Sequence, residues 1–242
     1  MKKLYGRDDL MKKKDDTLEI RKTVKVGSQL DFASREAFKL LRTNIFFAFP
    51  NEEKGKVVGI CSSCPREGKS TTSVNLAYSL AEANNKVLLI DGDMRRPSIY
   101  DIVEIDMEPG LSDVLSGKSG IEEAHGVLHE NLDVLVSGHI PPNPSELIGS
   151  RRMGALLNEY KEKYDYILID LPPVLSVSDP IAVSKYLGGM VIVVRHDKIR
   201  RRELAETIRQ LEYANVKMLG FVYNRIGPRS GKKNSKYKSY YK

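Results

Sequence analysis

A short polar segment, Ser63-Cys-Pro-Arg-Glu-Gly-Lys-Ser70, contains the residue types that bind the phosphates of a nucleotide. It follows an apolar β-branched run and precedes a helical pattern, which is the context that a phosphate-binding loop requires. Backbone N–H groups at the start of such a helix face the phosphates, and the helix dipole adds positive charge there. The general pattern of these loops begins with glycine, whereas this one begins with Ser63. The strand and helix on either side support the assignment despite that departure.

The residues at the end of this loop have expected partners on a nucleoside triphosphate and its metal ion. Lys69 can reach the β- and γ-phosphate oxygens, and the Ser70 hydroxyl is suited to ligate Mg²⁺. Thr71 or Thr72 can hydrogen-bond the α-phosphate. We therefore predict that ATP contacts one continuous run of residues, namely Ser63, Cys64, Pro65, Arg66, Glu67, Gly68, Lys69, Ser70 and Thr71.

Three carboxylates stand where predicted strands end. Asp91 closes the run Val87-Leu-Leu-Ile-Asp91, Asp93 follows two residues later, and Asp170 closes Tyr166-Ile-Leu-Ile-Asp170. The carboxyl ends of parallel strands meet at one edge of a sheet, so these acids are expected to share a crevice with the loop. Asp170 is then expected to hold Mg²⁺ through water, beside the Ser70 hydroxyl. The alternative is that the three are independent turn-forming Asp residues.

The acceptor of the phosphoryl group decides the function of such a crevice. Water as acceptor would make an ATPase switch, whereas a protein hydroxyl would make a kinase. A tyrosine hydroxyl has a pKa of about 10, so a carboxylate such as Asp91 would have to orient it and accept its proton. We predict catalytic roles for Lys69, Asp91, Asp93 and Asp170.

The C-terminal segment 227–242 contains a group of tyrosines that could be this acceptor. Tyr237, Tyr240 and Tyr241 lie among lysines, and the segment carries six basic and no acidic residues. Fully extended, it could span at most roughly 50 Å, enough to reach the site of a neighbouring copy. An acidic crevice would attract it. The alternative is a solvated basic end with no further role.

Composition and charge limit the class of protein. Residues 1–30 and 227–242 together carry a net charge of +10, so residues 31–226 carry −3 of the total of +7. A basic stripe through the fold is therefore not supported, and we expect no nucleic-acid partner. Two cysteines and the lack of an apolar leader or spanning segment favour a cytoplasmic protein. Association with the inner face of the membrane would then require a partner or the basic ends.

Short β-branched runs alternate with longer helical patterns, which is typical of a parallel α/β fold. The predicted strands are Lys56–Cys61, Val87–Ile90, Leu132–Val136, Tyr166–Ile169, Met190–Arg195 and Lys217–Tyr223, and the predicted helices are Ser70–Asn84, Pro144–Tyr164 and Arg200–Ala214. We expect one P-loop NTPase-like domain over residues 31–226, with a mostly parallel sheet and helices on both faces. We expect residues 1–30 and 227–242 to be flexible and without regular structure.

An additional helix is predicted between Asp31 and Phe49, ahead of the first strand. At 100° per residue, one arc contains the residues expected to pack on the body: Ala37, Phe38, Leu41, Asn44, Ile45 and Ala48. Glu36, Lys39 and Arg42 occupy most of the opposite arc and should form an outward charged strip. From the pattern alone, a plain solvated face explains this strip equally well.

Taken together, these motifs resemble the bacterial tyrosine kinases of capsule and exopolysaccharide synthesis, the BY-kinase family in its free-standing cytoplasmic form. The resemblance covers nearly all of residues 31–242. It includes the loop ending Glu67-Gly68-Lys69-Ser70, the Walker A′ element Asp91-x-Asp93-x-Arg95, and the Walker B element Asp170-x-x-Pro173. The segment Pro141-Pro-Asn-Pro-Ser-Glu-Leu147 and the terminal tyrosine cluster match as well.

This resemblance implies an ATP- and Mg²⁺-dependent protein-tyrosine kinase that phosphorylates its tail tyrosines in trans. It also implies that Asp93 and Asp170 arrange the metal and that Asp91 is the base. In the family, an E-x-x-R-x-x-R helix joins subunits into a ring; here the motif reads Glu36, Lys39, Arg42, and Lys lacks the planar fork of Arg. The family also implies activation by a membrane polysaccharide co-polymerase, regulation of polysaccharide synthesis and export, and further protein substrates. Asn224 matches the position at which related ATPases contact adenine.

Two other functions are compatible with several of these motifs. The MinD- and ParA-type partitioning ATPases share the fold and elements like those at Asp91 and Asp170. However, they carry a signature lysine near the start of the loop, where this chain has Cys64. A nucleotide-dependent scaffold without transfer activity is the second alternative.

Overall fold

Runs of Val, Ile and Leu form the centre of the sheet because neither face of these strands meets water. In the computed structural model, which describes residues 24–50 and 55–225, strands β1 (Lys56–Ser62), β2 (Val87–Asp91) and β5 (Tyr166–Asp170) are buried throughout. Successive side chains of a strand point to opposite faces. Val57 therefore joins the core on one side of the sheet and Val58 the core on the other.

Within the described residues, the strands form one sheet in which only one pair is antiparallel. Its order is β3 (His125–His129), β4 (Leu132–Leu135), β2, β5, β1, β6 (Gly189–Arg195) and β7 (Met218–Asn224). β3 runs antiparallel to β4, and all other neighbours are parallel. Asp170 on β5 lies in register with Asp91 on β2 and with Ile60 on β1. The two predicted strand-end acids are therefore neighbours beside the segment that follows β1.

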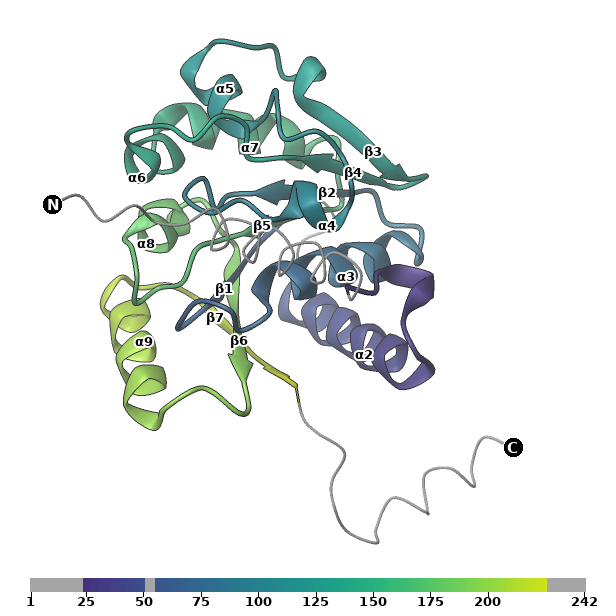
Figure 1. Ribbon diagram of the computed structural model, residues 1–242, viewed down its shortest axis with the longest axis vertical. Coiled ribbons are helices and arrows are strands. Elements are labelled where there is room, and N and C mark those ends of the chain that lie inside the picture. The colour runs from purple at the N-terminus through teal and green to yellow at the C-terminus, as the bar shows by residue number, and fades with distance from the viewer. Residues whose placement is uncertain (1–23, 51–54, 226–242) are drawn as a thin grey trace, which may run out of the picture.

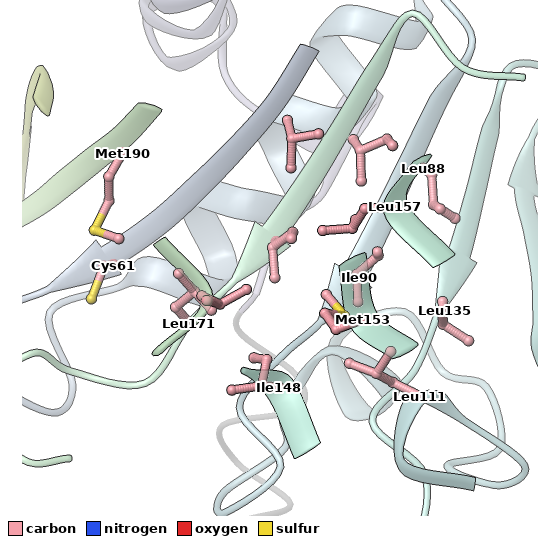
Figure 2. Packing of buried hydrophobic residues seen from close by; sticks show 14 of the residues in the cluster. Cys61, Leu88, Ile90, Leu111, Leu135, Ile148, Met153, Leu157, Leu171 and Met190 are labelled. Atoms are coloured by element: carbon pink, nitrogen blue, oxygen red, sulfur yellow. The ribbon is translucent and has the colours of Figure 1, made fainter. Parts of the chain in front are cut away.

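Helices cover both faces of the sheet, as predicted (Figure 1). One face packs against α2 (Phe32–Ala48), α3 (Lys69–Ala81) and α4 (Ile99–Ile102). The other packs against α5 (Leu111–Ser116), α6 (Pro144–Ile148), α7 (Arg151–Lys161), α8 (Asp179–Ser184) and α9 (Arg201–Tyr213). Figure 2 shows part of this second core, where Met153 and Leu157 of α7 lie near Leu88 and Ile90 of β2. The predicted α/β fold is confirmed.

Several elements differ from the sequence-based prediction. β3 was missed because it is a short edge strand without an apolar run, and its Val127 is exposed. The helix predicted over residues 144–164 is two helices, because α6 ends at Ile148 and the Ser150 side chain caps α7 by accepting from the Met153 N–H at 3.2 Å. The short helices α4, α5 and α8 were not predicted.

Part of the N-terminal segment is ordered against the body, contrary to our expectation for residues 1–30. Gly27–Gln29 form a 3₁₀ turn, and the Gly27 N–H donates to Asn75 Oδ1 at 2.9 Å. Asn75 Nδ2 in turn donates to the Lys25 carbonyl at 3.3 Å. The side-chain amide of α3 thus binds the backbone that precedes α2, which the sequence pattern alone did not indicate. The remainder of that segment, residues 1–23, and the tail 227–242 lie outside the described residues.

The length and apolar character of the helices show whether any of them could cross a membrane. Among the helices in residues 24–50 and 55–225, none combines the length and apolar character that crossing a bilayer requires.

Candidate active site

The predicted phosphate loop connects the end of β1 to the start of α3. Gly68, the residue before α3, has φ 91°, a left-handed conformation that favours glycine. A Cβ at this position would lie 2.1 Å from Asn224 Nδ2. Asn224, the last residue of β7, donates to the Glu67 carbonyl at 2.9 Å. Asn224 therefore lies against the loop, and its contact with adenine stays a prediction.

Other side chains hold the remaining parts of the loop. Glu67 is buried, which raises its pKa, and its carboxylate accepts the Cys64 N–H at 2.8 Å. Three residues later in the chain also bind loop atoms. Arg195 at the end of β6 donates to the Arg66 carbonyl at 3.3 Å, and Lys198 between β6 and α9 donates to the Pro65 carbonyl. Thr207 in α9 donates to Ser63 Oγ at 2.8 Å. Sequence reasoning missed these three because they lie far along the chain from the loop.

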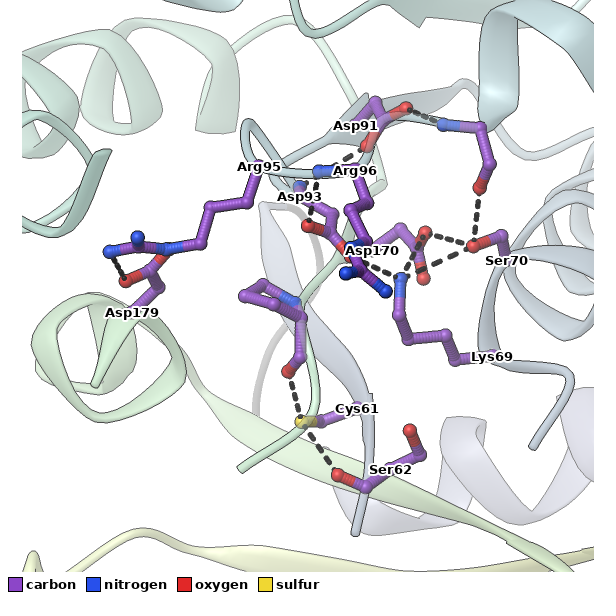
Figure 3. Close-up of polar contacts among 12 residues, drawn as sticks. Cys61, Ser62, Lys69, Ser70, Asp91, Asp93, Arg95, Arg96, Asp170 and Asp179 are labelled. Carbon is purple, nitrogen blue, oxygen red and sulfur yellow. Dashed lines mark hydrogen bonds and ion pairs between the residues drawn. The ribbon is translucent and has the colours of Figure 1, made fainter. Parts of the chain in front are cut away.

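Lys69, the loop lysine, lies between two of the predicted metal-binding acids. Its Nζ is 2.9 Å from Asp93 Oδ2 and 3.2 Å from Asp170 Oδ2 (Figure 3). Ser70 Oγ donates to the same Asp170 oxygen at 2.5 Å. All four side chains are buried. The structure therefore brings Lys69, Ser70, Asp93 and Asp170 together, and the alternative of independent turn-forming acids is wrong.

Asp91 lies beside this group and is held by backbone donors. Its carboxylate accepts the N–H groups of Asp93 at 3.2 Å, Ser98 at 3.1 Å and Ile99 at 3.0 Å. Burial, together with the negative charge of Asp170, raises the pKa of Asp91 to about 7, although Lys69 opposes this. Burial likewise raises the pKa of Asp170. Asp91 thus combines a fixed orientation with a proton affinity suited to exchange near neutral pH.

The charge of Lys69 is maintained despite its burial. Burial by itself lowers the pKa of an ammonium group, but the nearby carboxylates of Asp170 and Asp93 outweigh that effect and raise it. Lys69 therefore remains a cation among three acids.

Two serines of the site were not predicted. Ser98 Oγ donates to Ser70 Oγ at 2.9 Å, and Ser73 Oγ donates to Asp170 Oδ1 at 3.1 Å. Ser73 lies one turn after Lys69, so helical spacing could have identified it. Ser98 follows no motif, and only the return of the chain after Asp91 brings it to Ser70.

The oxygen donors of this crevice fit Mg²⁺. Magnesium is usually held by one or two carboxylates plus substrate phosphates and water, not by a cage of protein ligands. Ser70, Asp93 and Asp170 offer a hydroxyl and two carboxylates around one point, the Lys69 ammonium. Across residues 24–50 and 55–225 there is no group of three or more His, Cys, Asp or Glu side chains that would cage a metal without a nucleotide.

Of the three α2 residues predicted to join copies, one has a different orientation from the one predicted. Glu36 and Lys39 are exposed and pair with each other at 2.8 Å. Arg42 is half-buried and donates to the Ser79 carbonyl of α3, so its predicted outward orientation is wrong. The predicted packing arc is also too wide. Ile45 is buried, whereas Ala37 and Asn44 are exposed.

The fold and this crevice define a P-loop nucleotide-binding protein of the α/β class. A family model described as an AAA domain matches residues 56–215. Tyrosine-protein kinase YwqD of Bacillus subtilis (strain 168) is 40% identical over 206 residues, which cover 85% of this chain and 84% of that protein. The kinase domain of the Escherichia coli tyrosine kinase ETK superposes with a TM-score of 0.77 and 33% identity, covering 83% of this chain and 79% of that one.

The chain therefore belongs to the bacterial tyrosine kinases, as its motifs indicated, and is a protein-tyrosine kinase. Some relatives are much longer: the chain spans 26% of the tyrosine-protein kinase ptk of Acinetobacter johnsonii, to which it is 37% identical over 194 residues. The Pyrococcus furiosus cell division ATPase MinD has the same fold with a TM-score of 0.61 and 28% identity. The kinase assignment is thus better supported than the partitioning-ATPase alternative.

Proposed function

We propose that this kinase transfers the γ-phosphoryl group of MgATP to Tyr237, Tyr240 and Tyr241 of a neighbouring copy. The observation that carries this proposal is the convergence of Lys69, Asp93 and Asp170 beside Asp91. The three tyrosines lie outside the described residues, so their role rests on the sequence and on the family resemblance.

Each residue of the crevice would have a separate role in the reaction. The tyrosine oxygen attacks the γ-phosphorus while the bond from that phosphorus to the ADP oxygen breaks, and the tyrosine proton moves to the Asp91 carboxylate. The pKa of Asp91, about 7, lies close to the operating pH, which favours a general base. Lys69 and the N–H groups at the start of α3 would stabilise charge on the phosphates. Mg²⁺, when bound through Ser70, Asp93 and Asp170, would neutralise phosphate charge.

The charge of the tail supports its role as acceptor. Residues 227–242 carry six basic and no acidic residues, whereas residues 31–226 carry a net charge of −3. Transfer between copies would require self-association, for which we propose α2 with its exposed Glu36 and Lys39, and with Arg42 in a supporting position. Leu40, which is 63% exposed, and Phe47, which is 71% exposed, add apolar surface to that helix. The predicted consequence is a ring-like homo-oligomer.

The cellular setting is also a proposal. By resemblance to the free-standing members of the family, we propose a cytoplasmic kinase recruited to the inner face of the membrane by a polysaccharide co-polymerase, which activates it. Its output would be the regulation of capsular or exopolysaccharide synthesis and export, with other proteins as further tyrosine substrates.

Labelling of the full chain with radioactive ATP tests the proposed reaction. Wild-type protein should give phosphotyrosine in residues 237–241. Lys69→Met should remove it without unfolding the chain, while Lys118→Met at an exposed position should retain it. Release of free phosphate without phosphotyrosine would favour the ATPase alternative, and the absence of both the scaffold.

Mixing two variants tests whether transfer occurs between copies. One variant carries Lys69→Met and an intact tail, and the other is active but lacks residues 232–242. Label on the tail of the Lys69→Met chain is expected, because only the second chain can supply the reaction. No label in the mixture, with label in the wild type, would contradict transfer in trans.

A further inference from the structure

Arg95 belongs to the Walker A′ motif, but its side chain leaves the crevice (Figure 3). Its Nε donates to Asp179 Oδ2 at 3.0 Å, and its Nη2 donates to Asp179 Oδ1 at 3.1 Å. The Arg95 side chain is 39% exposed and that of Asp179 only 1%. This two-bond fork fixes both the distance and the orientation of the groups that it joins.

A third residue completes this contact. Arg95 Nη2 also donates to Ser145 Oγ at 2.9 Å, and the Ser145 hydroxyl donates to Asp179 Oδ1. Ser145 lies in α6, within the motif Pro141–Leu147 that the proposed reaction leaves without a role. Arg95, Asp179 and Ser145, called the arginine bridge below, thus join the β2–α4 loop to α8 and α6.

The bridge connects the chain segments that follow two of the site's acids. Arg95 is two residues after Asp93, in a loop whose Gly92 N–H donates to the Asp170 carbonyl at 2.8 Å. Asp179 is the first residue of α8, at the end of the loop that begins after Asp170. The bridge is therefore placed to keep the Asp93 loop and the Asp170 loop at a constant spacing.

The turn of the phosphate loop is held by residues outside the bridge. Asn224 binds the Glu67 carbonyl and Arg195 binds the Arg66 carbonyl. The loop after Asp170 binds the start of the phosphate loop, where the Leu175 N–H donates to the Ser63 carbonyl at 3.2 Å. Because Asn224 and Arg195 lie outside the bridge, its loss should leave the turn of the phosphate loop in place. A shift of about 1 Å at the reacting groups nevertheless lowers a rate by on the order of 10²-fold.

We infer that Arg95, Asp179 and Ser145 are positioning residues that set the spacing of Asp93 and Asp170, so that the bridge controls the rate of phosphoryl transfer and not nucleotide affinity. This inference rests on the proposed kinase function. Because lysine lacks the planar fork, it should not replace Arg95 fully.

Four variants of the full chain test this inference: Arg95→Gln, Arg95→Lys, Asp179→Asn and the double Arg95→Gln/Asp179→Asn. Single removal of either partner should lower kcat about 10- to 100-fold. The kcat of Arg95→Lys should lie between that of Arg95→Gln and that of the wild type. The dissociation constant of a fluorescent ADP analogue should stay within about threefold in all four, because Asn224 and Arg195 still hold the turn of the phosphate loop. Arg209→Gln, at an exposed arginine that pairs with Glu206 at 2.6 Å, is the matched control and should change neither quantity.

The double variant distinguishes a loss of positioning from the effect of leaving one buried charge without its partner. It contains neither charge, so it should fold as the wild type does in a thermal unfolding scan, yet its kcat should be as low as that of the single variants. A double variant with wild-type kcat would overturn the inference. So would loss of ADP binding in parallel with kcat, which indicates a merely structural role.

ATP consumption is followed beside phosphotyrosine in the same reactions. If the wild type consumes ATP without forming phosphotyrosine, the proposed function fails, while the rate of consumption still tests the bridge. If phosphotyrosine forms at equal rates in wild type and Arg95→Gln, the bridge inference fails and the kinase function stands.

Discussion

The crevice and α2 were both assigned function from their residue types, yet they are built in opposite ways. In the crevice, Lys69, Asp93 and Asp170 are buried and bind one another. On α2, Glu36 and Lys39 pair at the surface, and Phe47 projects with 71% of its area exposed.

The difference follows from the cost of burial. A buried polar or charged group without a partner is costly, so the polar groups of the crevice must satisfy one another within the same chain. The exposed ion pair on α2 contributes little to stability, and that helix is held by Ile45 and its neighbours instead. The groups that would bind MgATP thus all belong to one chain, whereas any role of α2 in assembly lies in surface that this chain does not bury.

The largest effect is expected for a change of charge inside the crevice. Asp170→Asn keeps the shape of the side chain but removes the negative charge that faces Lys69 and Ser70. Phosphotyrosine formation should fall by on the order of 10³-fold or more, since charge stabilisation dominates this type of reaction. The measurement is an initial-rate assay, with Asp106→Asn at an exposed position as control. Activity retained by Asp170→Asn would show that the acids are structural only.

On α2, a buried and an exposed apolar residue should behave differently. Ile45 is 2% exposed, so Ile45→Ala should lower the free energy of unfolding by about 2–4 kcal/mol. Leu40→Ala, at a residue that is 63% exposed, should change it by less than about 0.5 kcal/mol. Denaturant unfolding measures both. Equal costs would mean that α2 is not held by its inner face.

The pKa of Asp91 predicts how pH affects stability. Its folded pKa of about 7 lies above the unfolded value, so its contribution is full at low pH and is lost as pH rises to about 7. Asp91→Asn removes this dependence. The stability of the variant relative to wild type should therefore increase by up to about 1.4 kcal/mol per pH unit between pH about 4 and 7. Unfolding curves at several pH values measure it, and a constant difference would contradict the raised pKa.

The smallest effect on stability is expected on the outer face of α2. Phe47→Ser should change the free energy of unfolding by less than about 0.5 kcal/mol, because the side chain is largely in water. If α2 joins copies, the same substitution should reduce the mass of the particle in light scattering. An oligomer of unchanged mass would show that this face takes no part in assembly.

Elements with a clear apolar pattern were predictable and the others were not. The central strands are continuous apolar runs, and α2, α3 and α9 have enough residues for their apolar spacing to be recognised. β3 has no apolar run, and α4, α5 and α8 are too short for a helical period to be recognised. Lys69, Ser70, Asp91, Asp93 and Asp170 were recognised because each belongs to a local motif at the end of a strand. Ser98, Thr207 and Asp179 belong to no such motif.

Sequence by itself determined the residue types, the alternation of strands and helices, and the gathering of three acids and a lysine at the carboxyl edge of the sheet. Tertiary structure decided which groups touch. In the folded chain, Arg42 donates to a carbonyl of α3 instead of facing outward, and Arg95 pairs with Asp179. Burial raises the pKa of Asp91. The physical reason is that strand ends follow from local patterns, whereas burial and charge pairing depend on residues that folding brings together from distant parts of the chain.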